Sequence, residues 1–176
     1  MKRPLLLAIL SLFIANAAVA DQIGIYADAT GSSCNLTGTG LTETVAVIHK
    51  STSGAAGSRF RIDHSAATGI NVVGMIFPSP SVPIGNIETD MLVDYGGCRN
   101  GSILVGSLQI IWSPGASGTL SVVNPQPFRT VVSIHCDFGE YAATGGQASI
   151  NGASDPCGGP LAVEPSTWGS VKALYR

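Results

Sequence analysis

The segment "SIHCDF" (133–138) places His135, Cys136 and Asp137 side by side. A thiol with a nearby imidazole can form a nucleophile and its base, and both groups can bind metals. However, "RTVVSIHCDF" (129–138) has the alternation of a strand, in which neighbouring side chains point to opposite faces. His135 and Cys136 therefore cannot easily serve one reacting atom. We interpret Cys136 as half of a structural disulfide.

Cysteine number and spacing support that interpretation. The chain has four cysteines, Cys34, Cys98, Cys136 and Cys157, and no C-x2-C pair of the kind that binds zinc. An even number in an exported protein predicts two disulfides. Three pairings are possible and the sequence does not select one of them. Our working expectation is Cys34–Cys98 with Cys136–Cys157.

The carboxylates offer little evidence of catalysis or metal binding. A glycoside hydrolase needs two carboxyl groups that converge to about 5–9 Å, and the candidates are scattered in sequence: Asp63, Asp94, Asp137 and Glu140. Asp90 and Asp94, with Glu88, lack the D-x-D-x-D-G spacing of a calcium loop. G-x-S-x-G, H-E-x-x-H and P-loop motifs are also missing. The sequence predicts no catalytic, cofactor or metal site, and hence a protein that is not an enzyme.

Two other residue groups could bind sugars but have simpler interpretations. Trp112 continues a face that Leu104, Leu108 and Ile110 begin, so we expect it in the core. Arg59 and Arg61 alternate with Phe60 and Ile62, which places the arginines on a solvated strand face.

Residues 1–20 have the organisation of a secretory signal peptide. Lys2 and Arg3 precede a short apolar run, which ends in small Ala18 and Ala20 at the −3 and −1 positions of a cleavage site. We expect a mature chain that begins at Asp21 and is secreted or periplasmic.

The mature chain has the size of one domain and a weak negative charge. About 156 residues remain, and removing Lys2 and Arg3 leaves 7 basic against 11 acidic residues, so that 7 − 11 = −4. Clustered cations are scarce, which disfavours nucleic acid as a partner. No further stretch is long and apolar enough for a membrane span.

Short alternating or β-branched runs separated by glycine-rich turns predict an all-β fold. We expect strands at 22–28, 43–49, 58–63, 70–77, 90–95, 102–112, 119–123, 129–138 and 147–151. Between them, 50–58 reads as a loop, 96–101 and 113–118 as turns, and the proline-rich 78–86 as an edge or crossover loop. The spacing predicts a two-sheet antiparallel β-sandwich over residues 21–165.

The C-terminal segment 166–176 differs from the rest. After a proline, it carries an apolar stripe with helical spacing, formed by Trp168, Val171, Leu174 and Tyr175. We expect a short helix that packs on the sandwich or contacts a partner.

Several stretches resemble a known group of proteins. "IGIYADATGSSCNLTG", "YGGC", "ATGGQASING" and "WGSVKALYR" together resemble uncharacterised exported proteins of environmental bacteria. The strand order around "ETVAVIH" and "SRFRID" is similar to cohesin-like and immunoglobulin-like sandwiches. The first resemblance implies export and no particular chemistry, and the second implies architecture only.

These observations favour an exported, non-catalytic binding or adhesion module, whose partner is a protein or a glycan at the cell surface. One alternative is a structural subunit that assembles through 166–176. The other is a carboxylate-based glycoside hydrolase.

Overall fold

The structure is a computed structural model that describes residues 21–38, 41–126, 130–152 and 157. These residues form ten strands and no helix, which confirms the all-β prediction. The strands are β1 (Gln22–Tyr26), β2 (Asn35–Leu36), β3 (Thr42–Asp63), β4 (Ala67–Ile76), β5 (Val82–Asn86), β6 (Asp90–Val123), β7 (Val132–His135), β8 (Glu140–Ala142), β9 (Thr144–Gly145) and β10 (Gln147–Ile150). The expected C-terminal helix, with Trp168, Val171, Leu174 and Tyr175, lies outside the described residues.

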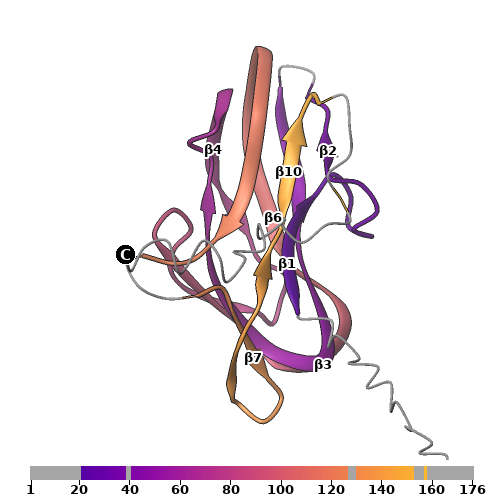
Figure 1. Ribbon diagram of the computed structural model, residues 1–176, viewed down its shortest axis with the longest axis vertical. Helices are drawn as coiled ribbons and strands as arrows, with labels where there is room; N and C mark the ends of the chain where they lie inside the picture. Colours follow the sequence, from indigo (N-terminus) through magenta and orange to yellow (C-terminus); the bar gives the residue numbers. More distant parts are fainter. Residues whose placement is uncertain (1–20, 39–40, 127–129, 153–156, 158–176) are drawn as a thin grey trace, which may run out of the picture.

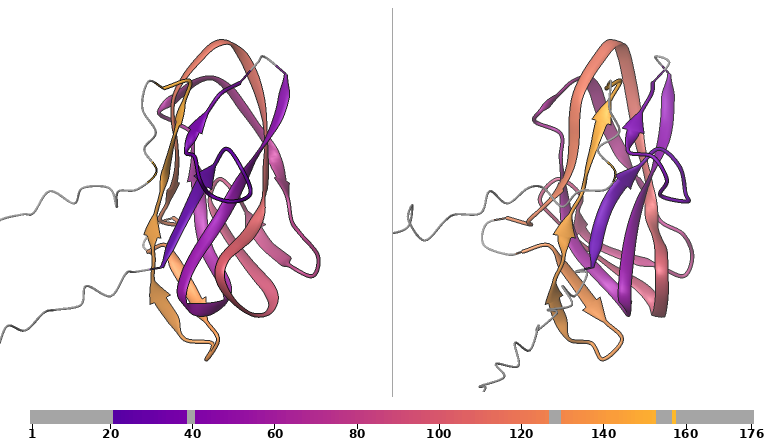
Figure 2. Two further views of the ribbon diagram at one scale, coloured as in Figure 1. Left: turned by 90° about the vertical axis from the view of Figure 1, so that its right-hand side faces the viewer. Right: turned by 45° about the vertical axis from the view of Figure 1, so that its right-hand side comes forward.

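The strands form the two layers of a sandwich (Figure 1; Figure 2). In the first layer, β1 lies between β9 and residues 42–51 of β3, and residues 101–111 of β6 separate β3 from β4. In the second layer, β5 pairs with residues 90–94 of β6, which pair with residues 57–60 of β3. β7 and then β8 follow on the other side of β3.

β3 and β6 belong to both layers, so all ten strands are part of one hydrogen-bonded network. Their pairing runs from Thr42↔Ile111 through Ser51↔Gly101 to Phe60↔Met91, so partner numbers fall as β3 numbers rise. The ladder shifts register near residues 51–57, where both strands bend from one layer to the other. Figure 1 shows this shared bend at the lower end of the molecule. The two layers are thus joined by continuous strands rather than by loops.

The core lies between the layers and is filled by alternate side chains, as expected for strands with one buried face. Fully enclosed residues come from both layers, and they include Ile23, Ile25, Val47, Phe60, Val93, Val105, Leu108, Ile110 and Leu120. Trp112 is 3% exposed, which confirms its predicted place in the core. A Cβ on Gly38 would lie 2.2 Å from the Trp112 ring, so this glycine lets the chain pass directly over the indole.

One loop and two turns that we predicted from the sequence are wrong. Residues 50–58 continue β3, and the turns expected at 96–101 and 113–118 lie within β6. The ladders carry bulges, and Gly54, Gly97 and Gly115 have positive φ, so the chain bends without leaving the sheet.

The proline-rich segment contains the edge strand β5, which pairs only with β6 among the described strands. An edge was one of the two expectations for this segment. Pro83 removes one backbone donor, which suits an edge position.

Leu104 departs from the predicted face. Ile48 pairs with Leu104 but Val47 pairs with Gly106, so one extra residue lies in β6 at this point. The shift turns Leu104 away from the Leu108 and Ile110 face, and Ile103 and Val105 are buried instead. Within the described part of the chain, no helix is long and apolar enough to cross a membrane.

Candidate functional site

All four cysteines form disulfides, but the expected pairing is wrong. The bonds are Cys34–Cys157 and Cys98–Cys136, each with a Cα–Cα distance of 5.1 Å. No described cysteine is a free thiol. Cys136 is therefore a structural half-cystine, as its place beside His135 led us to predict.

Strand pairing explains the observed partners. Ala55 of β3 pairs with Arg99 of β6 and also with His135 of β7. Cys98 directly precedes Arg99 and Cys136 directly follows His135, so the two cysteines meet across β3. Cys34 accepts a hydrogen bond at its carbonyl oxygen from the Ser149 amide of β10, at 2.8 Å, and Cys157 follows that strand. Neither neighbourhood could be read from cysteine spacing.

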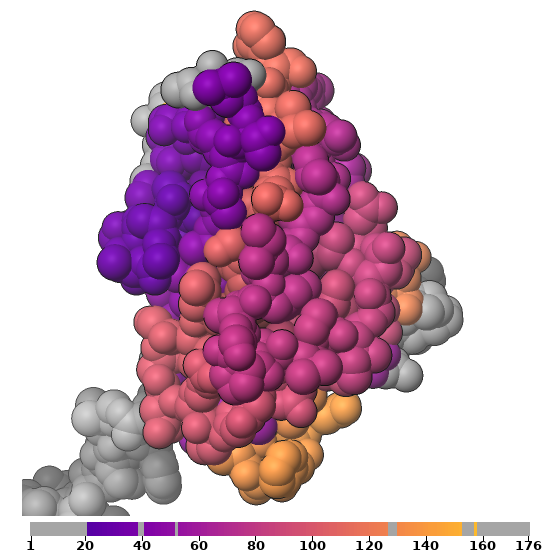
Figure 3. Space-filling view, turned by 180° about the vertical axis from the view of Figure 1, so that it is seen from behind, coloured from indigo at the N-terminus to yellow at the C-terminus, as the bar shows by residue number. Residues whose placement is uncertain are grey.

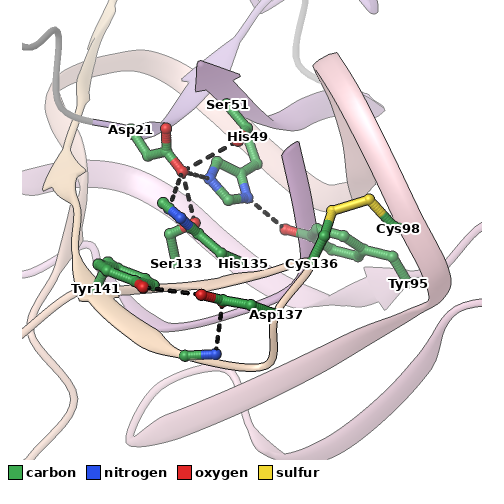
Figure 4. A network of polar contacts seen from close by, with 11 residues as sticks. Asp21, His49, Ser51, Tyr95, Cys98, Ser133, His135, Cys136, Asp137 and Tyr141 are labelled. Atoms are coloured by element: carbon green, nitrogen blue, oxygen red, sulfur yellow. Dashed lines mark hydrogen bonds and ion pairs between the residues drawn. A yellow bond between two sulfur atoms is a disulfide. The ribbon is translucent and has the colours of Figure 1, made fainter. Parts of the chain in front are cut away.

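His135 points away from Cys136 and into a buried polar cluster, which we call the Asp21 cluster (Figure 4). Its centre is the Asp21 carboxylate, which is 4% exposed. Asp21 Oδ2 accepts hydrogen bonds from Ser133 Oγ at 2.6 Å and from Ser51 Oγ at 3.1 Å. His135 Nε2 lies 3.1 Å from the same oxygen. The cluster therefore joins the start of β1 to β3 in one layer and to β7 in the other.

His49 completes the Asp21 cluster from β3. Its Nε2 lies 3.4 Å from Asp21 Oδ2, and its Nδ1 shares a 2.9 Å hydrogen bond with the Tyr95 hydroxyl. The pKa of His49 is lowered, mainly because the ring is buried, and the negative charge of Asp21 partly opposes this shift. Burial also raises the pKa of Tyr95. Both side chains are 0% exposed, and the His49 ring lies between Asp21 and Tyr95.

The Asp21 cluster has the residue types of a hydrolytic site but not the order. In a Ser–His–Asp triad the serine hydroxyl donates to the histidine, and the aspartate holds the other ring nitrogen. Here Ser133 and Ser51 both donate to the aspartate, so neither serine is activated by an imidazole. His49, Ser133 and Asp21 are also closed off from solvent. The arrangement stabilises a buried carboxylate by hydrogen bonds, as buried charges require.

The four carboxylates that were considered for a hydrolase lie in separate turns and strands, and each has its own local contacts. Asp63 accepts from the Ser65 amide at 3.0 Å, and Asp94 accepts from the Gly96 amide at 2.8 Å. Asp137 accepts from the Gly139 amide at 2.9 Å and from the Tyr141 hydroxyl at 3.0 Å, and Glu140 lies exposed on β8. The hydrogen bonds from the backbone amides of Ser65 and Gly139 lower the pKa of Asp63 and of Asp137. A general acid needs the opposite shift.

The acidic residues considered for calcium are also engaged separately. Arg59 donates to both carboxylate oxygens of Asp90, which lowers the pKa of Asp90. Glu88 lies 3.6 Å from His64 Nε2. In the described part of the chain, no three His, Cys, Asp or Glu side chains are grouped so that they could hold a metal ion.

Arg59 lies on the outer side of the second layer, as predicted, together with several apolar residues. The registers Ile84↔Leu92, Leu92↔Arg59 and Arg59↔Val132 place these four side chains in one row across four strands. Val82 and Ile134 flank the row. We call Val82, Ile84, Leu92, Val132 and Ile134 the outer apolar face. Val82 and Ile84 are 53% and 58% exposed, whereas Leu92 and Ile134 are half-buried and Val132 is 7% exposed. The Arg59–Asp90 ion pair lies within this face.

The first layer also exposes apolar side chains near its β4 edge. Val73, Ile76 and Ile111 are 55%, 56% and 43% exposed. Their strand neighbours on that side, such as Asn71 and Gln109, are polar. Figure 3 shows the side of the molecule where β4, β5 and the first part of β6 form most of the surface.

Sequence reasoning missed the Asp21 cluster and the outer apolar face. A histidine inside the apolar run "ETVAVIH" was one available signal, because a buried imidazole needs a polar partner. For the outer face the signal was the alternation of Val82 and Ile84 within the proline-rich segment. Nothing in the sequence indicated that Asp21 is the common partner of both histidines.

Comparisons with known proteins concern the fold alone. No protein-family model matches the sequence, and no curated protein matches it. Among solved structures, the chain is similar to one from a complex of CaCohA2 with a substituted CaDoc0917, crystallised at pH 5.5. The identity is 12% and the TM-score is 0.46, over 74% of this chain and 99% of that one.

Two other similar structures are cohesins. The non-cellulosomal cohesin of Archaeoglobus fulgidus has 11% identity and a TM-score of 0.45, over 74% of this chain and 91% of that one. The type III cohesin module of the ScaE cell-surface anchoring scaffoldin of Ruminococcus flavefaciens has 9% identity and a TM-score of 0.44, over 81% and 93% of the two chains. No binding residue is carried over from these modules.

Proposed function

We propose that the protein is an exported, non-catalytic β-sandwich that binds another protein through the outer apolar face. Export rests on the signal peptide expected at residues 1–20. The non-catalytic assignment is supported by the Asp21 cluster, in which the serines donate to the carboxylate, and by the separate turns that hold the candidate acids.

The exposure of Ile84 and Val82 is the main evidence for the proposed binding role. Both are large aliphatic side chains, more than half exposed, and Ile84 lies beside the half-buried Leu92 on the same face. Exposed aliphatic side chains that lie side by side are unfavourable in water and are typical of interaction sites. A charged pair inside an apolar face, here Arg59 with Asp90, adds specificity because a partner must match it.

The side chains of β5, rather than its backbone, provide the contact. β5 is an edge strand, but Pro83 lacks an amide donor, and the segment before it contains Pro78 and Pro80. Prolines at a sheet edge oppose the addition of a further strand. A partner that covers Ile84 and Leu92 therefore docks on the face of the sheet.

Matched substitutions test this proposal. Ile84→Asp and Ile76→Asp place the same charge at positions that are 58% and 56% exposed, on different layers. The purified protein, residues 21–176, is used to capture and cross-link proteins from the envelope and secreted fractions of the source organism. We expect the wild type and Ile76→Asp to retain the same protein and Ile84→Asp to lose it. Equal loss in both variants, or retention in both, would contradict the proposal.

A further inference from the structure

A polar pocket lies where β10 separates from β1, away from the outer apolar face. The Gly146 amide donates to the Ile23 carbonyl of β1 at 2.8 Å, whereas the Gly146 carbonyl accepts from the Val122 amide of β6 at 2.9 Å. After this residue the chain pairs with β6 instead of β1. The separation leaves a pocket of about 210 Å³, whose polar lining is Gln22, Tyr26, Ser32, Lys50 and Gln147.

Glycines keep the pocket open. Gly24 and Gly146 both line it, and a Cβ on Gly146 would lie 3.1 Å from the Gly24 Cα. A Cβ on Gly24 would lie 2.9 Å from the Tyr26 ring and hydroxyl, so the ring extends over bare backbone. Side chains at these two positions would close the space between the strands. Because Gly24 and Gly146 have no side chains, a ligand in the pocket can reach the backbone of these residues.

The polar groups in the pocket have spare hydrogen-bonding capacity. No described residue makes a hydrogen bond with the side-chain amides of Gln22 and Gln147 or with the Tyr26 hydroxyl. Each amide can both donate and accept. Gln22 and Gln147 are half-buried, and both line the pocket although they are distant in sequence. Such groups can bind adjacent hydroxyls, which also donate and accept.

Lys50 supplies a positioned positive charge. Its Nζ lies 4.5 Å from the centre of the Tyr26 ring and donates to the Gly31 carbonyl at 3.1 Å. These contacts use one of the three ammonium protons and hold the group beside the amides. The nearby Asp28 carboxylate is occupied by the Thr30 and Ser32 hydroxyls of its own loop.

We propose that this pocket binds the terminal unit of an acidic glycan, a hexuronic acid residue. Its carboxylate pairs with Lys50, and its hydroxyls bind the Gln22 and Gln147 amides. The volume lies below the range of about 300–1,000 Å³ that is usual for drug-sized ligands, so a single sugar unit fits and a longer segment does not. The proposal is independent of protein binding at the outer apolar face.

Titration of the ¹⁵N-labelled protein with galacturonate and glucuronate tests this site. The Gln22 and Gln147 side-chain amide signals report binding directly by NMR. We expect saturable shifts for the hexuronates and for tri-galacturonate, and at least about tenfold weaker binding of glucose and of acetate. Equal binding of acetate, exclusion of the trisaccharide, or no saturable shift would each overturn the proposal.

Substitutions test which side chains of the pocket bind the hexuronate. Lys50→Met and Gln147→Leu should each weaken hexuronate binding by about tenfold. Arg61→Met and Gln109→Leu are the matched controls, because neither side chain lines the pocket, and they should leave the affinity unchanged. Circular dichroism checks the fold, and Gln147→Leu carries the test if Lys50→Met does not fold. Unchanged affinity in a folded Gln147→Leu variant would contradict the assignment.

Discussion

The Asp21 carboxylate and the His49 ring are enclosed together between the layers, with Oδ2 and Nε2 3.4 Å apart. Asp21 precedes β1 and His49 lies within β3, while Ser133 and His135 bring β7 to the same oxygen. One carboxylate thus connects segments that are distant in the sequence. Several consequences for stability can be measured.

Replacement of Asp21 should strongly destabilise the fold. In Asp21→Ala, the buried hydroxyls of Ser51 and Ser133 lose their acceptor and His49 loses its charged neighbour. Leaving buried polar groups without partners costs about 3 kcal/mol or more. The measurement is chemical denaturation under oxidising conditions. Asp137→Ala, which removes an exposed turn carboxylate, is the control and should leave the transition close to that of the wild type.

Stability should fall as the pH drops below about 6.5, because of His49. Burial lowers its pKa in the fold, so below the ordinary value of 6.5 the unfolded chain takes up a proton that the folded chain does not. The free energy of unfolding then falls by up to about 1.4 kcal/mol per pH unit until the folded pKa is reached. Asp21 opposes the shift, and His135 adds to it.

Denaturation between pH 5 and pH 8 measures this slope. His49→Gln should flatten it, because the group that titrates is gone. His64→Gln is the control, since His64 is partly exposed beside Glu88. A wild-type slope that persists in His49→Gln would assign the effect to another group.

Strand patterns in the sequence predicted most of the architecture, because alternation depends on local burial. The runs around Ile23, Phe60 and Leu120 form strands with those side chains inside. The continuity of β3 and β6 was not predictable in the same way. Glycines such as Gly97 mark turns in most sequences, and only pairing with a neighbour decides whether the chain bends within the sheet.

The candidate sites depended on contacts between distant segments, which one sequence does not contain. His135 was expected to face away from Cys136, and it does, because that follows from strand geometry. The choice of Asp21 as its partner depends on how β1 and β7 pack. Likewise, the exposure of Ile84 follows from the edge position of β5, which its prolines only suggested.

The disulfides should be detected as the pairs 34–157 and 98–136. Proteolysis without reduction, followed by mass spectrometry, should yield these two cross-linked peptide pairs and neither of the other two pairings. In the chain-entropy picture a longer closed loop is more stabilising. The bonds close 123 and 38 residues, so their loss should cost about 5 and about 4 kcal/mol. Cys34→Ser/Cys157→Ser should then unfold at lower denaturant than Cys98→Ser/Cys136→Ser.

If residues 1–20 are a signal peptide, as we propose, cleavage should occur between Ala20 and Asp21. The Thr144 amide donates to the Asp21 carbonyl at 2.8 Å, and the Asp21 side chain is held in the cluster, so the folded domain already positions this residue. Cleavage one residue later would remove Asp21, with the loss of stability expected for Asp21→Ala. Mass spectrometry of the mature protein should therefore show an N-terminal Asp21. Ala20→Lys should accumulate precursor, because the −1 position needs a small residue, whereas Val19→Leu at −2 should be processed normally. A mature chain that starts at Gln22 or later and is fully stable would refute both the cleavage site and the role of Asp21.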